Sequence, residues 1–243
     1  MIRFDKTPVP ETQNIIIGDT IGILKPIPFS KPQKLIFLFL ASVFLIVGSF
    51  SADSYVQQQI LAANHGHWSH NPLVSALSKY GDWPELMLAG GLGFLVAQKL
   101  RNARWQRILL CAMLASTLAG ATVNVSRLTT GRTRPRAAAE QGWYGPYHDG
   151  KWLIGKADFN SFPSGHTATA VGFAAVILIA APAWGIPAMI VALAVTLSRI
   201  LLGAHHPSDV VTAALLALAI AWAVWEFTPK SHAKDAESAE EGN

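Results

Sequence analysis

The sequence predicts an all-α, polytopic membrane protein built as a bundle of six transmembrane helices. Of its 243 residues, 51% are apolar and only 14% are charged. The mean hydropathy of +0.32 is too high for an ordinary soluble domain. Six apolar segments approach the roughly 20 residues that a helix needs to cross a bilayer. They are Leu35–Ala52, Pro84–Gln98, Ile108–Val125, Thr167–Ala181, Ile186–Leu202 and Val210–Phe227.

The parts of the chain on either side of these segments have a different character. Residues 1–34 contain five prolines, which break any helical period, so we expect a cytoplasmic or interfacial N-terminal segment. Residues 35–228 hold the six apolar segments and form the predicted membrane domain. Residues 229–243 are acidic and rich in Ala and Ser, which predicts a disordered cytoplasmic tail.

Each apolar segment carries its own signals for a helix. The first follows Lys31 and Lys34, as expected at a membrane surface. The second is short, but Pro84 suits a helix start, and Glu85 in the first turn complements the helix dipole. The third and fourth are rich in Ala, Gly, Ser and Thr, which permits close helix packing. The link between the fourth and fifth is short and uncharged.

The distribution of basic residues predicts the orientation. The N-terminal stretch, the link after the second segment and the start of the tail are basic, so the positive-inside rule places both termini in the cytoplasm. The expected location is the inner (plasma) membrane of a bacterium. The loop over residues 126–166 is also basic, although this topology puts it outside. Its charges therefore indicate a function, and we expect the active site at the outer face.

Three polar clusters lie where apolar segments end, and the topology brings all three to the outer surface. The first contains Arg127 and Arg134, and the second is Ser161–Thr167. The third runs from Ser198 through Arg199 and His205 to Asp209. One more or one fewer helix between them would scatter them across the bilayer.

The second cluster has the features of an oxyanion site. Pro163 suits the entry to a helix, Ser164 can cap it, and Gly165 lets a ligand approach the backbone. The free N–H groups of a helix start attract phosphate. His166 adds a side chain that can give or take a proton near neutral pH.

The other clusters supply charge and a reactive imidazole. Arg127, Arg134 and Arg199 can bind phosphate oxygens with their planar guanidinium groups. His205 and Asp209 are four residues apart, so the carboxylate can orient the imidazole as a base or nucleophile. With His166 as the acid across the site, this arrangement suits in-line displacement at phosphorus.

The clusters together resemble the signature of the type 2 phosphatidic acid phosphatase superfamily, in its membrane-bound lipid phosphatase branch. The resemblance rests on Arg127-x6-Arg134-Pro135, Pro163-Ser164-Gly165-His166, and Ser198-Arg199-x5-His205-x3-Asp209. At helix level it covers about residues 84–227. The second and third parts match fully, whereas Arg127 stands where the family usually has Lys.

The resemblance implies a six-helix membrane phosphatase that needs no metal or other cofactor. His205 would form a phosphohistidine, assisted by Asp209, and His166 would protonate the leaving group. The phosphoryl oxygens would be held by Arg127, Arg134, Ser164, Gly165 and Arg199. The partners expected are a lipid phosphate substrate and the bilayer, with no nucleic acid. The sequence does not indicate an oligomeric state.

Several residues allow a second interpretation. Arg127, Arg132, Arg134 and Arg136 could be interfacial anchors, and His206 could replace His205 as the reacting ring. Arg199 could extend its guanidinium to the membrane interface as a snorkelling side chain. Asp209 could simply interact with the dipole in the first turn of a helix, and His166 could simply cap a helix. His65, His67 and His70 could bind a metal, but an interfacial loop is favoured. Trp143, Tyr144, Tyr147 and Trp152 could anchor the outer loop or line a lipid entrance.

Three functions remain open from the sequence. A lipid phosphate or diphosphate hydrolase is favoured over a non-catalytic phosphate carrier and over a vanadate-dependent haloperoxidase relative. A carrier would typically have broken helices and paired halves, and neither feature is found in this sequence. The candidate substrates are undecaprenyl diphosphate, phosphatidylglycerol phosphate, phosphatidic acid and a lipid A phosphate.

Overall fold

A computed structural model describes residues 31–64, 68 and 70–229. The chain divides into two units, Met1–Phe39 and Leu40–Asn243, and each is described by itself. In the first unit, residues 31–39 are helical and begin α1. The predicted N-terminal segment lies almost wholly outside the described residues, as do the tail from residue 230 and the side chains of His65 and His67.

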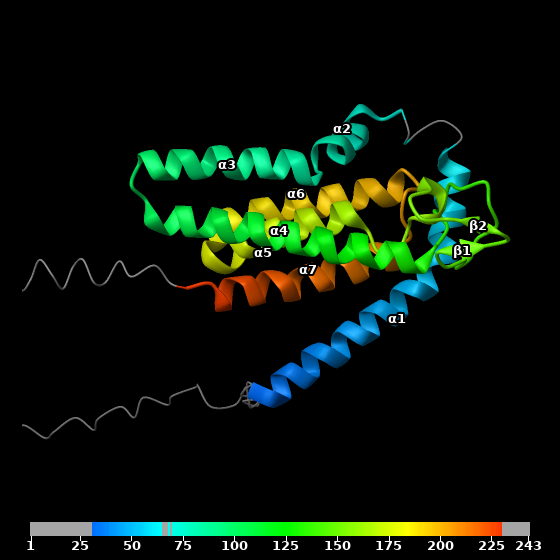
Figure 1. The fold of residues 1–243 in the computed structure, drawn as a ribbon, viewed down its shortest axis with the longest axis horizontal. Helices are drawn as coiled ribbons and strands as arrows, with labels where there is room; N and C mark the ends of the chain where they lie inside the picture. The colour runs from blue at the N-terminus through cyan, green and yellow to red at the C-terminus, as the bar shows by residue number, and fades with distance from the viewer. Residues whose placement is uncertain (1–30, 65–67, 69, 230–243) are drawn as a thin grey trace, which may run out of the picture. The chain divides into compact units, whose positions relative to one another are not determined.

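Seven α-helices are found in the described residues (Figure 1). They are α1 Lys31–Asn64, α2 Pro72–Tyr80, α3 Trp83–Lys99, α4 Ala103–Thr130, α5 Gly165–Ala180, α6 Pro182–Leu201 and α7 Pro207–Phe227. All six predicted segments fall within helices, apart from one or two residues at an end. Each of these predicted helices begins before its predicted segment, by one residue at α3 and by up to five at α4, which begins at Ala103.

Four of these helices are long and apolar enough to cross a membrane. They contain the stretches Pro32–Ala62, Ala103–Thr130, Pro182–Leu201 and Pro207–Phe227. The chain is thus an integral membrane protein. Helix α5 is apolar but has 16 residues, and α3 has 17, so a count of six spans stays a prediction.

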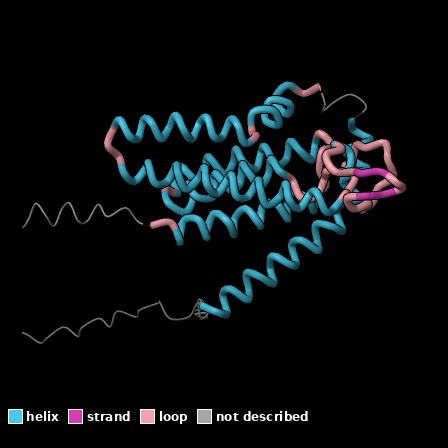
Figure 2. Tube along the Cα trace, in the orientation of Figure 1, coloured by secondary structure: helices cyan, strands magenta, loops and turns pink. Residues whose placement is uncertain are grey.

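Two elements were not predicted. Helix α2 is capped by Asn71, whose Oδ1 accepts from the backbone N of Leu73 and Val74, and Pro72 follows as its first residue. The link between α4 and α5 contains one 3-10 turn and a hairpin, whose two strands are magenta in Figure 2. Its strands, β1 Tyr147–His148 and β2 Lys151–Trp152, pair antiparallel, and the turn is Ala157–Phe159.

Small residues let α4, α5 and α7 pack closely. The buried core of the second unit is dominated by alanine, and Ala115, Ala119 and Ala217 are fully buried. A Cβ on Gly172 of α5 would lie 3.2 Å from the carbonyl oxygen of Ala115 on α4. This close approach is the packing that the small-residue pattern predicts.

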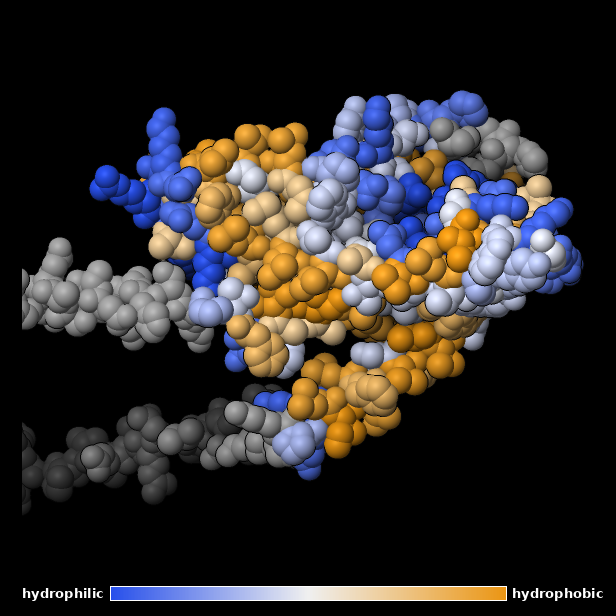
Figure 3. All heavy atoms as spheres, in the orientation of Figure 1, coloured by the Kyte–Doolittle hydropathy of each residue, from blue (hydrophilic) through white to orange (hydrophobic). Residues whose placement is uncertain are grey.

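The links of the second unit fall at two opposite ends (Figure 1). The α4–α5 and α6–α7 links lie at one end, and the α3–α4 and α5–α6 links lie at the other. Figure 3 shows a hydrophobic surface over the helices between hydrophilic residues at these ends. The three polar clusters therefore share one end of the bundle.

Candidate active site

Two arginines near the C-terminal end of α4 lie in different environments. Gly131 ends the helix in the left-handed conformation, with φ 56°, which glycine adopts without strain. Arg127 remains in the last helical turn, where its Nε donates to the carbonyl oxygen of Pro163 at 2.9 Å. Arg132, just beyond the turn, enters the interior and is 6% exposed. Arg132 is thus not an interfacial anchor.

The N-terminus of α5 forms as predicted. Ser164 is the N-cap, and its Oγ accepts from Thr167 Oγ1 at 3.0 Å and from the backbone N of Thr167 at 3.5 Å. Gly165 lies against Arg127, because a Cβ there would be 2.7 Å from Nη2 of Arg127. The α5 helix start and an arginine therefore share one small volume, in which a phosphoryl group could be bound from both sides.

His166 points at a residue that the sequence did not single out. Its Nε2 lies 3.5 Å from Oδ2 of Asp82, while Oδ1 of Asp82 accepts from the backbone N of Trp83 at 2.8 Å and caps α3. Burial, with the like charge of Arg199, lowers the pKa of His166 to about 4, and the Asp82 carboxylate opposes this shift.

Arg199 and Arg134 approach the same end of the bundle from α6 and from the α4–α5 link. Arg199 donates to Oγ of Ser78 on α2, and its carbonyl oxygen accepts from the backbone N of His205 at 3.3 Å. Burial lowers the pKa of Arg134, and the like charge of Arg136 adds to the effect. An anion bound there would offset the cost of burying these charged guanidinium groups.

His205 is buried in a defined tautomer. Its Nδ1 lies 2.7 Å from the carbonyl oxygen of Ser161, which can only accept a hydrogen bond, so Nδ1 carries the proton. Burial lowers the pKa of His205 to about 3; Asp209 opposes this shift, and Arg127 and Arg199 add to it. The ring is neutral at physiological pH, with a lone pair on Nε2, as a nucleophile requires.

Asp209 is fully buried but its closest partner is not His205. Its Oδ2 lies 3.6 Å from Nδ1 of His205, beyond hydrogen-bond distance. It accepts instead from Ser161 Oγ at 2.5 Å, from the backbone N of His206 at 2.8 Å and from Arg132 Nη1 at 2.5 Å. Asp209 thus acts on His205 through its charge, and Ser161 orients the ring.

The predicted residues do converge. The backbone N of Ser164 donates to the carbonyl oxygen of Asp209 at 3.1 Å, which joins the α5 and α7 starts. His166 and His205 both lie within electrostatic range of Arg127 and Arg199. Among the predicted site residues, three buried nitrogens lack a partner in the described part of the chain: Nε of Arg134, Nε of Arg199 and Nε2 of His205. Two cationic donors and one imidazole nitrogen of the predicted site are therefore free for an anionic ligand.

A cavity of about 430 Å³ adjoins this site. It begins at His166 and Arg127 and extends between α3, α4 and α5 to Thr117, three helical turns down α4. Its polar lining is Asp82, Thr117, Asn124, Arg127, His166 and Thr169. Because it follows the sides of the helices, it could hold a substrate that arrives from the bilayer.

The structure also bears on the metal site, on His206 and on Trp143, which the sequence left open. Among the described residues no three His, Cys, Asp or Glu side chains are grouped to hold a metal ion, and His65 and His67 lie outside that part of the chain. The ring of His206 turns to the carbonyl oxygen of Thr133, 3.2 Å from its Nε2. Trp143 packs over Arg132, its ring centre 4.7 Å from the guanidinium carbon.

Comparisons with known proteins agree with this layout. The family model of the PAP2 superfamily matches residues 108–233. A lipid A 1-phosphatase of Rhizobium etli is 32% identical over 94 residues, and one of Rhizobium johnstonii is 31% identical over the same length. These matches cover 38% of this chain and 38% and 36% of those proteins, so the chain matches well under half of either relative.

A solved structure shares the fold. The transmembrane PAP2-type phosphatidylglycerolphosphate phosphatase of Bacillus subtilis aligns with a TM-score of 0.51 and 20% identity, over 79% of this chain and 94% of that one. The family model covers more than half of the sequence and includes all three polar clusters. The chain therefore belongs to the PAP2 superfamily.

Proposed function

We propose that this protein is a metal-independent, integral-membrane lipid phosphatase that works through a phosphohistidine at His205. The observation that carries the proposal is the state of His205: buried, neutral, with Nδ1 held by Ser161 and Nε2 without a partner among the described residues. The arginines around it provide the positive charge that a phosphoryl group requires.

In the first step, Nε2 of His205 attacks phosphorus and the bond from phosphorus to the lipid oxygen breaks. His166 gives its proton to the departing oxygen, which leaves as the alcohol, or as a phosphate if the substrate is a diphosphate. Burial and Arg199 lower the pKa of His166 to about 4 in the protein without substrate. The negative charge of a bound phosphate would add to that of Asp82, 3.5 Å from Nε2 of His166, and raise this pKa toward the protonated form that the step needs. The imidazole of His205 becomes positively charged, and Asp209 stabilises that charge.

In the second step, water attacks the phosphohistidine. His166, now neutral, accepts the proton from the water, the bond between phosphorus and Nε2 breaks, and inorganic phosphate leaves. Both histidines return to their starting states. Arg127, Arg134, Arg199, the backbone N–H of Gly165 and the hydroxyl of Ser164 hold the phosphoryl oxygens in both steps.

The substrate class follows from the setting of the site. The cavity beside His166 runs along helices that lie in the membrane, so the phosphate is presented on a lipid and the tail occupies the cavity. Both termini would be cytoplasmic and the site would face outward, since Lys99, Arg101 and Arg104 lie at the opposite end of the bundle. The Rhizobium relatives make a lipid A 1-phosphate the first substrate to test, and the Bacillus structure adds phosphatidylglycerol phosphate.

The test is phosphate release by detergent-solubilised protein. The wild type and His205→Asn are compared on lipid A 1-phosphate, phosphatidylglycerol phosphate, undecaprenyl diphosphate and phosphatidic acid. We expect release from at least one lipid and none from the variant. An inactive wild type that still binds phosphate would favour a carrier, and full activity in the variant would exclude His205 as nucleophile.

A further inference from the structure

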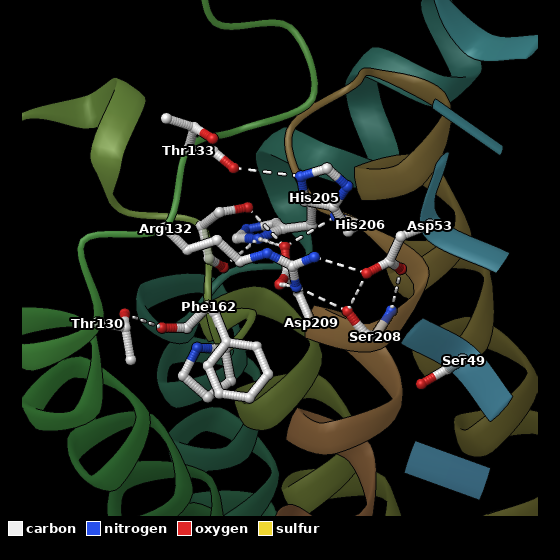
Figure 4. A network of polar contacts seen from close by, with 12 residues as sticks. Ser49, Asp53, Thr130, Arg132, Thr133, Phe162, His205, His206, Ser208 and Asp209 are labelled. Carbon is white, nitrogen blue, oxygen red and sulfur yellow. Dashed lines mark hydrogen bonds and ion pairs between the residues drawn. The ribbon is translucent and has the colours of Figure 1, made fainter. Parts of the chain in front are cut away.

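A buried guanidinium joins the catalytic carboxylate to the first helix. Nη1 of Arg132 donates to Oδ1 of Asp209 at 2.5 Å, and its Nη2 donates to Oδ2 of Asp53 at 2.5 Å (Figure 4). Asp53 lies on α1, 79 residues before Arg132 and far from the three sequence clusters. One arginine therefore binds two carboxylates, one on α1 and one on α7.

Ser208 closes this network. Its Oγ accepts from Nη1 of Arg132 at 2.6 Å and donates to Oδ2 of Asp53 at 2.6 Å. Its backbone N donates to Oδ1 of Asp53 at 2.9 Å. Asp53 thus fixes the start of α7, the helix that also carries Asp209.

The surroundings leave Arg132 little freedom. It is 6% exposed, and Asp53 is also 6% exposed. Its guanidinium carbon lies 4.7 Å from the ring centre of Trp143, 5.3 Å from that of Phe50 and 5.9 Å from that of Phe162. Aromatic rings that cover a buried cation stabilise it and exclude water, which strengthens its pairing with both carboxylates.

We propose that Arg132 and Asp53 are positioning residues for phosphoryl transfer to His205. Arg132 keeps Asp209 ionised, and Asp53 shares the charge of Arg132 so that Asp209 retains negative charge for the imidazole. The proposal rests on the function given above. It adds two residues that touch neither the phosphoryl group nor His205.

The charges explain why two carboxylates are needed. A lone buried carboxylate beside a neutral imidazole would take up a proton, and Arg132 prevents this for Asp209. If Arg132 paired with Asp209 alone, the two charges would cancel before the reaction began. With Asp53 included, the resting network carries one negative charge in excess. The positive charge that forms on His205 during phosphorylation then brings the network to neutrality.

The geometry of this network requires the planar guanidinium group of an arginine. Asp209 and Asp53 bind different nitrogens of the same guanidinium, and no other side chain offers two parallel donors with a permanent charge. Lysine keeps the charge but places it as a single point.

The experiment compares Asp53→Asn, Arg132→Ala and Arg132→Lys with the wild type, as full-length protein in detergent. The readouts are kcat, KM and the amount of acid-labile phosphoenzyme after a rapid quench. We expect Asp53→Asn to lower kcat by about tenfold or more with KM nearly unchanged, because only the charged transition state is affected. Arg132→Lys should keep less than about a tenth of the wild-type kcat.

Chemical rescue separates charge from folding. Arg132→Ala leaves a guanidinium-sized space under Trp143 and Phe50, so millimolar guanidinium should raise its kcat by about tenfold, whereas urea and ammonium should not. The matched controls are Asp149→Asn and Lys151→Gln, both in the exposed hairpin of the α4–α5 link. Both should keep the wild-type kcat.

The outcomes are distinct. A folded Asp53→Asn with the kcat of the wild type would overturn the proposal, as would a loss confined to KM or a failure of guanidinium to raise the kcat of Arg132→Ala. If His205→Asn remains active in the same assay, the phosphatase mechanism itself fails. If His205→Asn is inactive and Asp53→Asn is fully active, only the positioning role of Asp53 and Arg132 is contradicted.

Discussion

The carbonyl oxygen of Ser161 lies 2.7 Å from Nδ1 of His205, and this contact sets which ring nitrogen carries the proton. Ser161 also donates from its Oγ to Asp209 at 2.5 Å. A single residue of the α4–α5 link thus holds both the imidazole and the carboxylate. The consequence is a ring with a fixed tautomer, in which Nε2 carries no proton.

Replacing His205 by Asn should abolish turnover without unfolding the protein. The Asn amide can still donate to Ser161 but has no equivalent of Nε2, so phosphate release should fall by about a thousandfold or more. The melting temperature in detergent should stay close to that of the wild type. His206→Gln is the matched control, and it should keep activity within about fivefold because its ring faces Thr133.

The same substitution should change how stability depends on pH. The folded-state pKa of His205, about 3, is below its unfolded value, so the unfolded chain binds the extra proton as pH falls below about 6.5. Stability is complete above that pH and is lost progressively toward pH 3. At pH 5 the contribution of His205 to this loss is about 2 kcal/mol. Relative to its own value at pH 7.5, His205→Asn should lose less stability at pH 5 than the wild type, as measured by thermal unfolding.

Gly165→Ala should disturb the phosphate site specifically. The new Cβ would lie 2.7 Å from Nη2 of Arg127 and displace the guanidinium. We expect kcat/KM to fall by about tenfold while the fold is kept. Gly91→Ala on α3 has open space around its Cβ and should be neutral or slightly stabilising. Equal activity in both variants would show that Arg127 does not bind the substrate there.

Arg127→Lys introduces the residue that the family usually carries. Lysine keeps the charge but loses the hydrogen bond from Nε to Pro163, so we expect activity within about tenfold of the wild type. Arg127→Gln removes the charge and should cost about a hundredfold in kcat/KM. The measurement is steady-state kcat/KM of the wild type and the two variants on one lipid substrate. Equal losses in the two variants would mean that this position requires the planar guanidinium group and that a positive charge alone does not replace it.

Metal removal and vanadate test the chemistry. The proposed mechanism draws its charge from Arg127, Arg134 and Arg199, so EDTA should leave phosphate release unchanged. Vanadate, which resembles phosphate and can bind at His205, should inhibit competitively. Loss of activity in EDTA that returns with magnesium would contradict the mechanism.

The helices and the three polar clusters could be predicted because each has a local signal. Apolar length gave the helices, and Ser164, Gly165 and His166 stand together in the chain. The contact of His205 with Ser161 and that of His166 with Asp82 could not be predicted, because each joins residues that are distant in the sequence.

Asp53 shows the limit most clearly. The first predicted segment stopped at Ala52, because a charged residue inside a membrane span is costly. In the structure the helix continues to Asn64, and Asp53 is buried because Arg132 compensates its charge. The identity of the partner depends on how α1 packs, and no local pattern encodes that. The short helix α2 was missed for a simpler reason, since Asn71 and Pro72 are a start signal that we did not use.

The shared guanidinium has a consequence for biogenesis. The first helix enters the membrane with an acidic side chain whose counterion is synthesised 79 residues later, and that counterion also needs Asp209 at the start of the last helix. A nascent chain that stops before α7 contains Asp53, Arg132 and His205 but lacks Ser208 and Asp209, so the charge network is incomplete. Completion of this network therefore requires the final helix, although Asp53 and Arg132 are made long before it.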